Sequence, residues 1–172
     1  MNKKLRYAAL VAAVLALGGF ASTTMAAATA TTSFNVTLTL DATCDTTTLA
    51  ATALGFGEHT YLDTITSTST VSIKCSTGTA FNIGLDAGAN PGTSGDITTR
   101  RMKGGTGSDY VSYQLYTDSG YGTAWGNNSS NGWVAKTGTG SAVTYTVYGK
   151  ASPISTSPAG SYSDTVGVTV TY

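Results

Sequence analysis

Hydrophobic and polar positions alternate along this chain in short runs, the pattern of strands that bury one face. No stretch of twelve residues or more keeps helical spacing without an intervening glycine or turn cluster. The expected strands are Ser33–Leu40, Ala53–Gly57, Thr66–Cys75, Phe81–Leu85, Thr99–Lys103, Asp109–Thr117, Val143–Lys150 and Ser161–Tyr172, with one more short strand within 118–140. Short strands with turn signals about every ten residues predict a single all-β sandwich domain, with Asp109–Thr117 central.

Two of these strands lie at the ends of the chain. The apolar positions of the last one are Val166, Val168, Val170 and Tyr172, and no later segment is present to pair with it. The apolar positions of the first one are Phe34, Val36, Leu38 and Leu40. An all-β chain with an open edge and a spare strand completes itself by pairing, and a second copy is one available partner. This pattern favours assembly over catalysis.

Residues 1–26 have the three regions of a secretion signal. Lys3, Lys4 and Arg6 form its positive start, and an apolar run follows from 7 to 20. Small residues then allow cleavage after Ala26, with Ala28 as the alternative. The apolar run is shorter than the ~20 residues of a membrane-spanning helix, so we expect export rather than anchoring.

Charge limits the classes of partner. Charged residues make up only 10% of the chain, but ten tyrosines and many β-branched residues allow a core to form. Without the three basic residues of the leader, six basic and nine acidic residues remain, a net charge of about −3. The only basic cluster is Arg100, Arg101 and Lys103, which is too small to bind phosphates alone, so no nucleic-acid partner is expected.

Cys44 and Cys75 are the two cysteines, and in an exported chain they predict one disulfide. Their separation of 31 residues implies a stabilisation of about 3–4 kcal/mol. Zinc takes four ligands, and His59 is the only further histidine or cysteine, so no metal site is expected. With a single histidine, no Gly-x-Ser-x-Gly elbow, and aspartates mostly at expected turns, the chain predicts no catalytic residue and no cofactor.

Three aromatic residues beside a polar loop are candidates for a sugar-stacking platform: Tyr121, Trp125 and Trp133. Exposed aromatic rings serve as binding anchors. Tryptophan is highly buried on average, so a place in the core is the favoured interpretation of Trp125, and Trp133 fits either role.

Several ordered pieces of the mature chain resemble the spore coat protein U domain family, which includes the subunits of archaic (Csu-type) chaperone–usher pili. The pieces are Thr43-Cys44, Leu54-Gly55-Phe56-Gly57, Val71–Cys75, Phe81–Gly88, Arg100-Arg101-Met102, Val111–Tyr116 with Asp118 and Trp125, Val147-Tyr148-Gly149, and Gly160–Tyr172. Residues 127–141 have no pattern that matches. It is the ordered set, rather than any single piece, that is specific.

The resemblance implies an incomplete immunoglobulin-like sandwich that lacks its final strand. A periplasmic chaperone would lend a strand, and at an outer-membrane usher the N-terminal segment of another subunit would replace it. Residues 27–43 would then be the donor segment, with Phe34, Val36, Leu38 and Leu40 entering a neighbour, and residues 44–172 would be the pilin domain. Val166, Val168, Val170 and Tyr172 would form the acceptor edge strand.

These observations predict a structural subunit of a cell-surface pilus or fimbria that serves adhesion or biofilm formation. Its partners would be other copies or sister pilins joined head to tail, the chaperone and the usher. Three alternatives remain open at this stage: a secreted carbohydrate-binding module, a spore or cell-coat protein, and a hydrolase that uses acidic residues. Self-complementation, with 34–40 folded into the chain's own groove, is also open.

Overall fold

The computed structural model describes residues 27–59, 64–104, 107–152 and 157–172. The expected secretion signal, residues 1–26, lies outside the described residues. The chain divides into two units, Met1–Leu38 and Thr39–Tyr172. The described part of the first unit, residues 27–38, forms neither helix nor strand, and its side chains are exposed.

The second unit is all-β apart from one short 3-10 helix, η1 (Ile97–Thr99), within the ranges described. Its strands are β1 (Cys44–Ala51), β2 (Ile65–Cys75), β3 (Ala80–Leu85), β4 (Arg101–Gly104), β5 (Tyr110–Tyr116), β6 (Val134–Thr137), β7 (Ala142–Ser152), β8 (Tyr162–Ser163) and β9 (Val168–Thr171). They form a six-stranded sheet in the order β1-β2-β7-β5-β4-β8 and a three-stranded sheet in the order β6-β3-β9. All the pairings between these strands are antiparallel.

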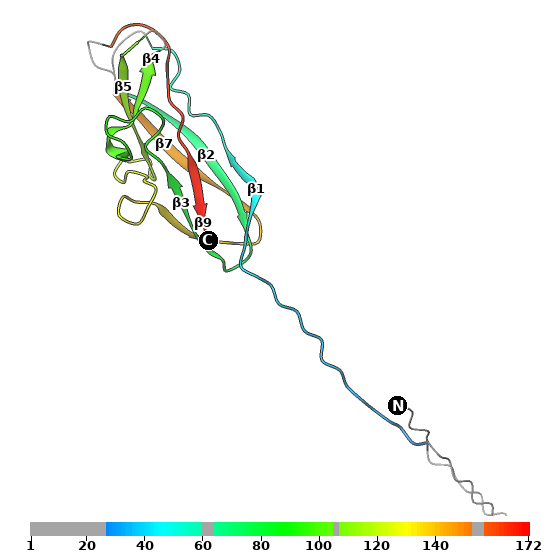
Figure 1. Cartoon of the computed structure of the whole chain (residues 1–172). Coiled ribbons are helices and arrows are strands. Elements are labelled where there is room, and N and C mark those ends of the chain that lie inside the picture. Colours follow the sequence, from blue (N-terminus) through cyan, green and yellow to red (C-terminus); the bar gives the residue numbers. More distant parts are fainter. Residues whose placement is uncertain (1–26, 60–63, 105–106, 153–156) are drawn as a thin grey trace, which may run out of the picture. The chain divides into compact units, whose positions relative to one another are not determined.

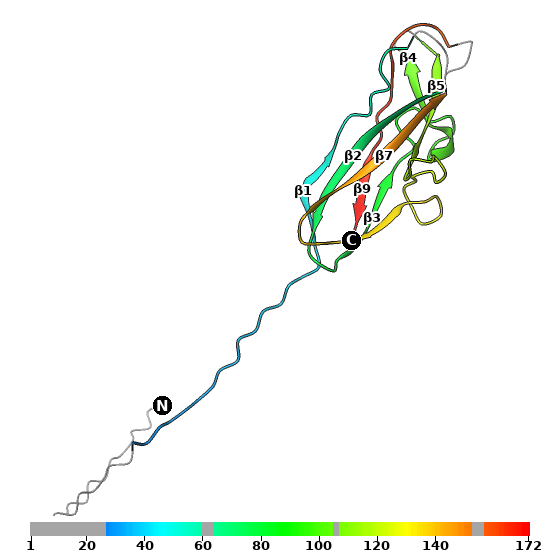
Figure 2. The same ribbon diagram turned by 180° about the vertical axis from the view of Figure 1, so that it is seen from behind.

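The two sheets pack face to face, which confirms the predicted sandwich. Figures 1 and 2 show β2 and β7 in one layer and β3 and β9 in the other, seen from opposite sides. The core between them is built from the inward positions of both layers, such as Ile73 of β2, Leu115 of β5 and Ile83 of β3. Strand β5 lies between β7 and β4, the central position that its two apolar faces predicted.

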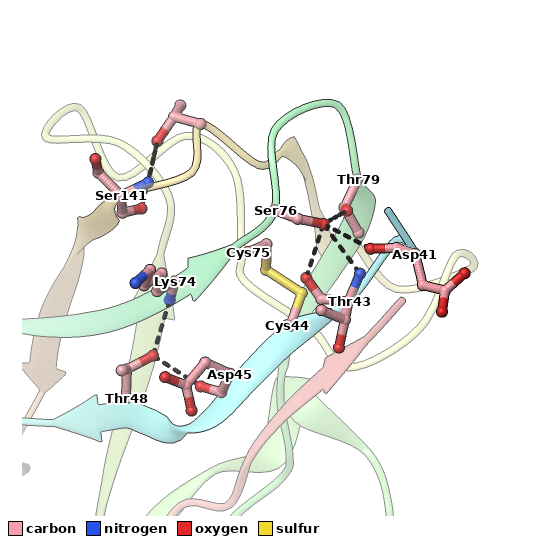
Figure 3. The surroundings of a disulfide bond; sticks show 11 residues. Asp41, Thr43, Cys44, Asp45, Thr48, Lys74, Cys75, Ser76, Thr79 and Ser141 are labelled. Atoms are coloured by element: carbon pink, nitrogen blue, oxygen red, sulfur yellow. Dashed lines mark hydrogen bonds between the residues drawn. A yellow bond between two sulfur atoms is a disulfide. The ribbon is translucent and has the colours of Figure 1, made fainter. Parts of the chain in front are cut away.

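The predicted disulfide is present. Cys44 begins β1 and pairs in register with Cys75 at the end of β2, and both cysteines are buried. Figure 3 shows Ser76 beside the disulfide: its hydroxyl accepts a hydrogen bond from Thr43 N at 3.1 Å and lies 2.6 Å from Thr79 Oγ1. The disulfide therefore fastens the point at which the N-terminal segment enters the sandwich.

Four elements differ from the expected ones: one observed strand was not expected, two expected strands are absent, and one is broken in two. Strand β1 was not predicted, because Asp45 and the threonines after it show no alternation; its pairing with β2 is irregular between Asp45 and Ala50. The segment 53–57 is not a strand. The hydroxyl groups of Ser67 and Ser69 bond the backbone carbonyls of Gly55 and of the adjacent Thr52, where a strand would have backbone-to-backbone hydrogen bonds. The expected strand 33–40 is absent, because this segment pairs with no other strand among the described residues, and the expected strand 161–172 is broken into β8 and β9.

Candidate functional site

Strand β9 has one free edge. It pairs with β3 alone among the described strands, with Leu85 opposite Val168 and Ile83 opposite Val170. Val168 and Val170 are half-buried, while Thr169 and Thr171 are exposed, so the apolar face points toward the core. Tyr172 is 55% exposed. Val168 and Val170 therefore lie on the core-facing side of β9, the side that the alternation of the sequence indicates.

A groove of about 390 Å³ opens beside this strand, between the edges of the two sheets. Its base is formed by inward residues of both sheets, and its two walls are the segments 51–56 and 162–168. Besides two alanines and two tyrosines, the apolar residues that line it are Leu54, Phe56, Val71, Leu85, Met102, Leu115, Val147, Val166 and Val168. A concave apolar surface of this size, with several half-buried side chains, is characteristic of an interaction site.

The wall opposite β9 is held by serine hydroxyl groups. Ser69 Oγ donates to the carbonyl of Thr52 at 2.6 Å, and Ser67 Oγ donates to the carbonyl of Gly55 at 2.7 Å. Leu54 and Phe56 consequently lie over Gly149 of β7, where the missing side chain leaves room for them. Sequence reasoning missed Leu54 and Phe56 as groove residues; the Leu-Gly-Phe-Gly motif was the signal, but it was interpreted as a strand.

One end of the groove is polar. Tyr113 of β5 and Asp164 both line it, and the Tyr113 hydroxyl donates to Asp164 Oδ2 at 2.7 Å. Burial raises the pKa of the Tyr113 phenol, and the hydrogen bond to Asp164 raises it further, so Tyr113 remains a donor. Behind them lies Arg100, which is 1% exposed; burial lowers the pKa of its guanidinium, while the charges of nearby groups oppose that effect.

The expected donor side chains are all exposed. Phe34, Val36, Leu38 and Leu40 are 84%, 84%, 81% and 83% exposed, respectively. Four large apolar side chains at alternating positions, all in water, form a row that is suited to burial on one face of a strand.

The three aromatic residues of the candidate sugar platform do not share one surface. Trp125 is 1% exposed and donates through Nε1 to the carbonyl of Ile83 at 2.9 Å, the core position favoured for it. Tyr121 packs edge-on against Tyr116. Trp133 lines a second cavity, of about 580 Å³, whose lining includes Trp125 but not Tyr121.

The described part of the chain offers few residues for a catalytic or metal site. The His59 ring lies 2.6 Å from the carbonyl of Phe56, and within the described ranges no three acidic, histidine or cysteine side chains gather as metal ligands. Among those residues, no helix is long and apolar enough to cross a membrane.

Two known proteins are similar to this chain, one in sequence and one in fold. Protein U of Myxococcus xanthus is 36% identical over 107 residues, which are 61% of this chain and 59% of that protein. A solved structure, the CsuC–CsuE chaperone–tip adhesion subunit pre-assembly complex from archaic chaperone–usher Csu pili of Acinetobacter baumannii, contains a chain with the same fold. The TM-score is 0.57 at 24% identity, over 78% of this chain and 41% of that one. This chain therefore spans about three-fifths of the curated relative and two-fifths of the structural one.

The family comparison covers most of the sandwich and the segment before it. The Spore Coat Protein U domain matches residues 30–169, a range that includes the exposed apolar row and the first half of β9. The chain belongs to the Spore Coat Protein U domain family.

Proposed function

We propose that this chain is a structural subunit of a surface pilus or fimbria, assembled by the chaperone–usher route through donor-strand complementation. The proposal rests on the presence of two complementary features in the same chain. One is an apolar groove beside the free edge of β9, and the other is an exposed row of four alternating apolar side chains. In the assembled fibre, residues 27–43 of one copy fill the groove of the next, whose sandwich is residues 44–172.

The energetics favour such an exchange. Burying Phe34, Val36, Leu38 and Leu40 gives a gross gain of about 6–12 kcal/mol. Main-chain hydrogen bonds to β9 add to this gain and close the exposed edge. A slip of one residue would turn the apolar row outward, so the register is tightly defined. Because the contact is head to tail, it propagates as an open fibre unless its geometry closes a ring.

The proposed partners follow from the open groove. Before assembly, the groove would be covered by a periplasmic chaperone that lends a strand, and transfer to the next subunit would take place at an outer-membrane usher. The similarity in fold to a chain of a chaperone–tip adhesion subunit complex supports this route. Export through the periplasm to the cell surface and a role in adhesion or biofilm formation follow from the same proposal, which assigns the chain no catalytic residue, metal or cofactor.

A coat is the alternative destination for the same strand exchange. The family name, Spore Coat Protein U domain, favours it. The carbohydrate-binding alternative keeps one supporting observation, the cavity that Trp133 lines with Tyr145 and Tyr148. It loses another, because the buried Trp125 cannot present its face to a sugar.

The test uses material sheared from the producing cell and run on an SDS gel, unboiled and boiled. We expect a ladder that collapses on boiling and that disappears when residues 31–40 are deleted. Leu38→Asp should also abolish it, because a charge would enter the groove, whereas Thr37→Asp on the outward face should leave it intact. A monomer band in every lane, or a wild-type ladder from Leu38→Asp, would reject the proposal; the monomer would indicate a self-completed sandwich.

A further inference from the structure

The segment before β9 is attached to the sandwich by a carboxylate. Asp164 Oδ1 accepts hydrogen bonds from Ala89 N at 3.0 Å, from Asn90 N at 3.1 Å and from Asn90 Nδ2 at 2.9 Å. Its other oxygen, Oδ2, accepts from the Tyr113 hydroxyl at 2.7 Å. One half-buried side chain thus ties the wall of the groove both to the loop after β3 and to the centre of the other sheet.

A second carboxylate holds the chain immediately before β9. Asp86 Oδ1 accepts from Gly167 N at 2.9 Å and from Gly88 N at 2.8 Å, and Asp86 N donates to the carbonyl of Gly167 at 3.0 Å. A side chain on Gly167 would overlap the Asp86 carboxylate, and one on Gly88 would overlap that of Asp164. The two glycines therefore allow the backbone to approach both carboxylates closely.

The base to which these aspartates attach is rigidly held. Arg100, which is 1% exposed, donates to the carbonyls of Leu85 and Trp125 at 2.7 and 2.9 Å and to Gln114 Oε1 at 2.6 Å. It also donates to the carbonyl of Asp86. The guanidinium thereby joins the end of β3 in one sheet to β5 in the other, independently of any strand in the groove.

We propose that Asp86 and Asp164 act as positioning residues for strand exchange: they form a clasp that holds the free edge of β9 in a strand-accepting geometry before the donor arrives. This inference rests on the proposed function. Strand β9 has only four residues and one partner strand in the described structure, and a short edge of this kind opens readily. A wall already held in place lowers the ordering cost that an incoming strand has to meet.

The experiment compares two quantities from the same producing cells: the folded, disulfide-bonded subunit in the periplasmic extract and the SDS-resistant ladder on the surface. Asp164→Ala removes one half of the clasp, and Asp164→Asn keeps an oxygen acceptor for the N–H groups of Ala89 and Asn90. Asp118→Ala is the matched control: that carboxylate accepts three backbone N–H bonds, as Asp164 accepts two backbone and one side-chain N–H bond, but it lies in an exposed turn outside the groove.

We expect Asp164→Ala to lower the ratio of ladder to folded subunit at least about tenfold, because losing even one of its four hydrogen bonds to the charged carboxylate has an effect of that size. Asp164→Asn should restore most of the ratio, and Asp118→Ala should leave it unchanged. If Asp164→Ala does not fold, Tyr113→Phe decides the matter, because it keeps the core ring and removes only the hydroxyl bond; we expect it to lower the ratio as well.

Three outcomes would overturn the clasp. The first is an unchanged ratio in both Asp164→Ala and Tyr113→Phe, and the second is a parallel fall of subunit and ladder, which would indicate a role in stability only. In both of these cases a wild-type ladder that Leu38→Asp abolishes shows that the proposed function still holds. The third is the absence of any wild-type ladder, which removes the proposed function and the clasp together.

Discussion

At the scale of single residues, Trp125 connects the two sheets. Its backbone N donates to the carbonyl of Leu115 in β5 at 2.8 Å, and its ring Nε1 donates to the carbonyl of Ile83 in β3 at 2.9 Å. The side chain is 1% exposed, so neither bond can be replaced by water. A large aromatic residue held by a buried hydrogen bond contributes through both its apolar area and its polar tip.

Replacing Trp125 with phenylalanine should lower the free energy of unfolding by about 2–4 kcal/mol, because it leaves a cavity and removes the buried hydrogen bond to the carbonyl of Ile83. Urea denaturation of the assembled or otherwise strand-completed protein measures the change. The half-buried Trp133 provides the comparison, and Trp133→Phe should cost less than about 0.5 kcal/mol. Equal costs for the two substitutions would contradict the core role of Trp125.

At the scale of elements, β9 presents two faces of different character. Val168 points toward the groove and the core, while Thr169 is exposed and lies opposite Gly84 of β3. We expect Val168→Lys to abolish the ladder, because the strand would have to bury a charge to keep its register. Thr169→Lys is the neighbouring control and should retain the ladder. A ladder of normal length from Val168→Lys would show that β9 is not the accepting edge.

The β1–β2 pair is the second element whose contribution can be measured. The Cys44–Cys75 disulfide closes a loop with a sequence separation of 31, and removing it should lower the free energy of unfolding by about 3–4 kcal/mol. The double variant Cys44→Ser/Cys75→Ser, compared with the oxidised protein in guanidinium, tests this. An unchanged denaturation midpoint would mean that the irregular β1–β2 pairing is held by its backbone and hydroxyl contacts alone.

At the scale of the whole molecule, stability should be nearly constant between about pH 5 and pH 9. On the acid side, hydrogen bonds from hydroxyl and backbone N–H groups hold the pKa values of Asp45, Asp96 and Asp118 below the ordinary 3.8. Their contribution is therefore complete above that value and is lost as the pH falls through the depressed pKa values of the folded state.

On the alkaline side, burial raises the pKa values of Tyr113 and Tyr145 above the ordinary 10.0. The folded protein keeps these protons while the unfolded chain releases them, so stability is complete below pH 10.0 and falls as the pH rises beyond it. Denaturation midpoints measured across the pH range check both limits. Tyr113→Phe should flatten the alkaline fall, and a steep change inside the plateau would contradict this assignment of groups.

The main strands and the disulfide were predictable from the sequence. Alternation is a local property, so β2, β3, β5, β7 and β9 could be recognised from a few residues each. The expected donor row and acceptor valines rest on the same local pattern, and their pairing stays a prediction. Strand β1 could not be found in this way, because Asp45 and the adjacent threonines lack alternation and depend on β2 and the disulfide for their conformation.

Only the tertiary structure decided which residues far apart in the chain contact one another. Leu54 and Phe56 line the groove only because Gly149, some ninety residues later, leaves space for them. Asp164 meets its partners across separations of 51 to 75 residues, and Trp125 reaches Ile83 across 42. Periodicity reports which face of a strand is apolar, whereas a wall, a clasp or a buried hydrogen bond depends on which strands become neighbours when the sheets pack.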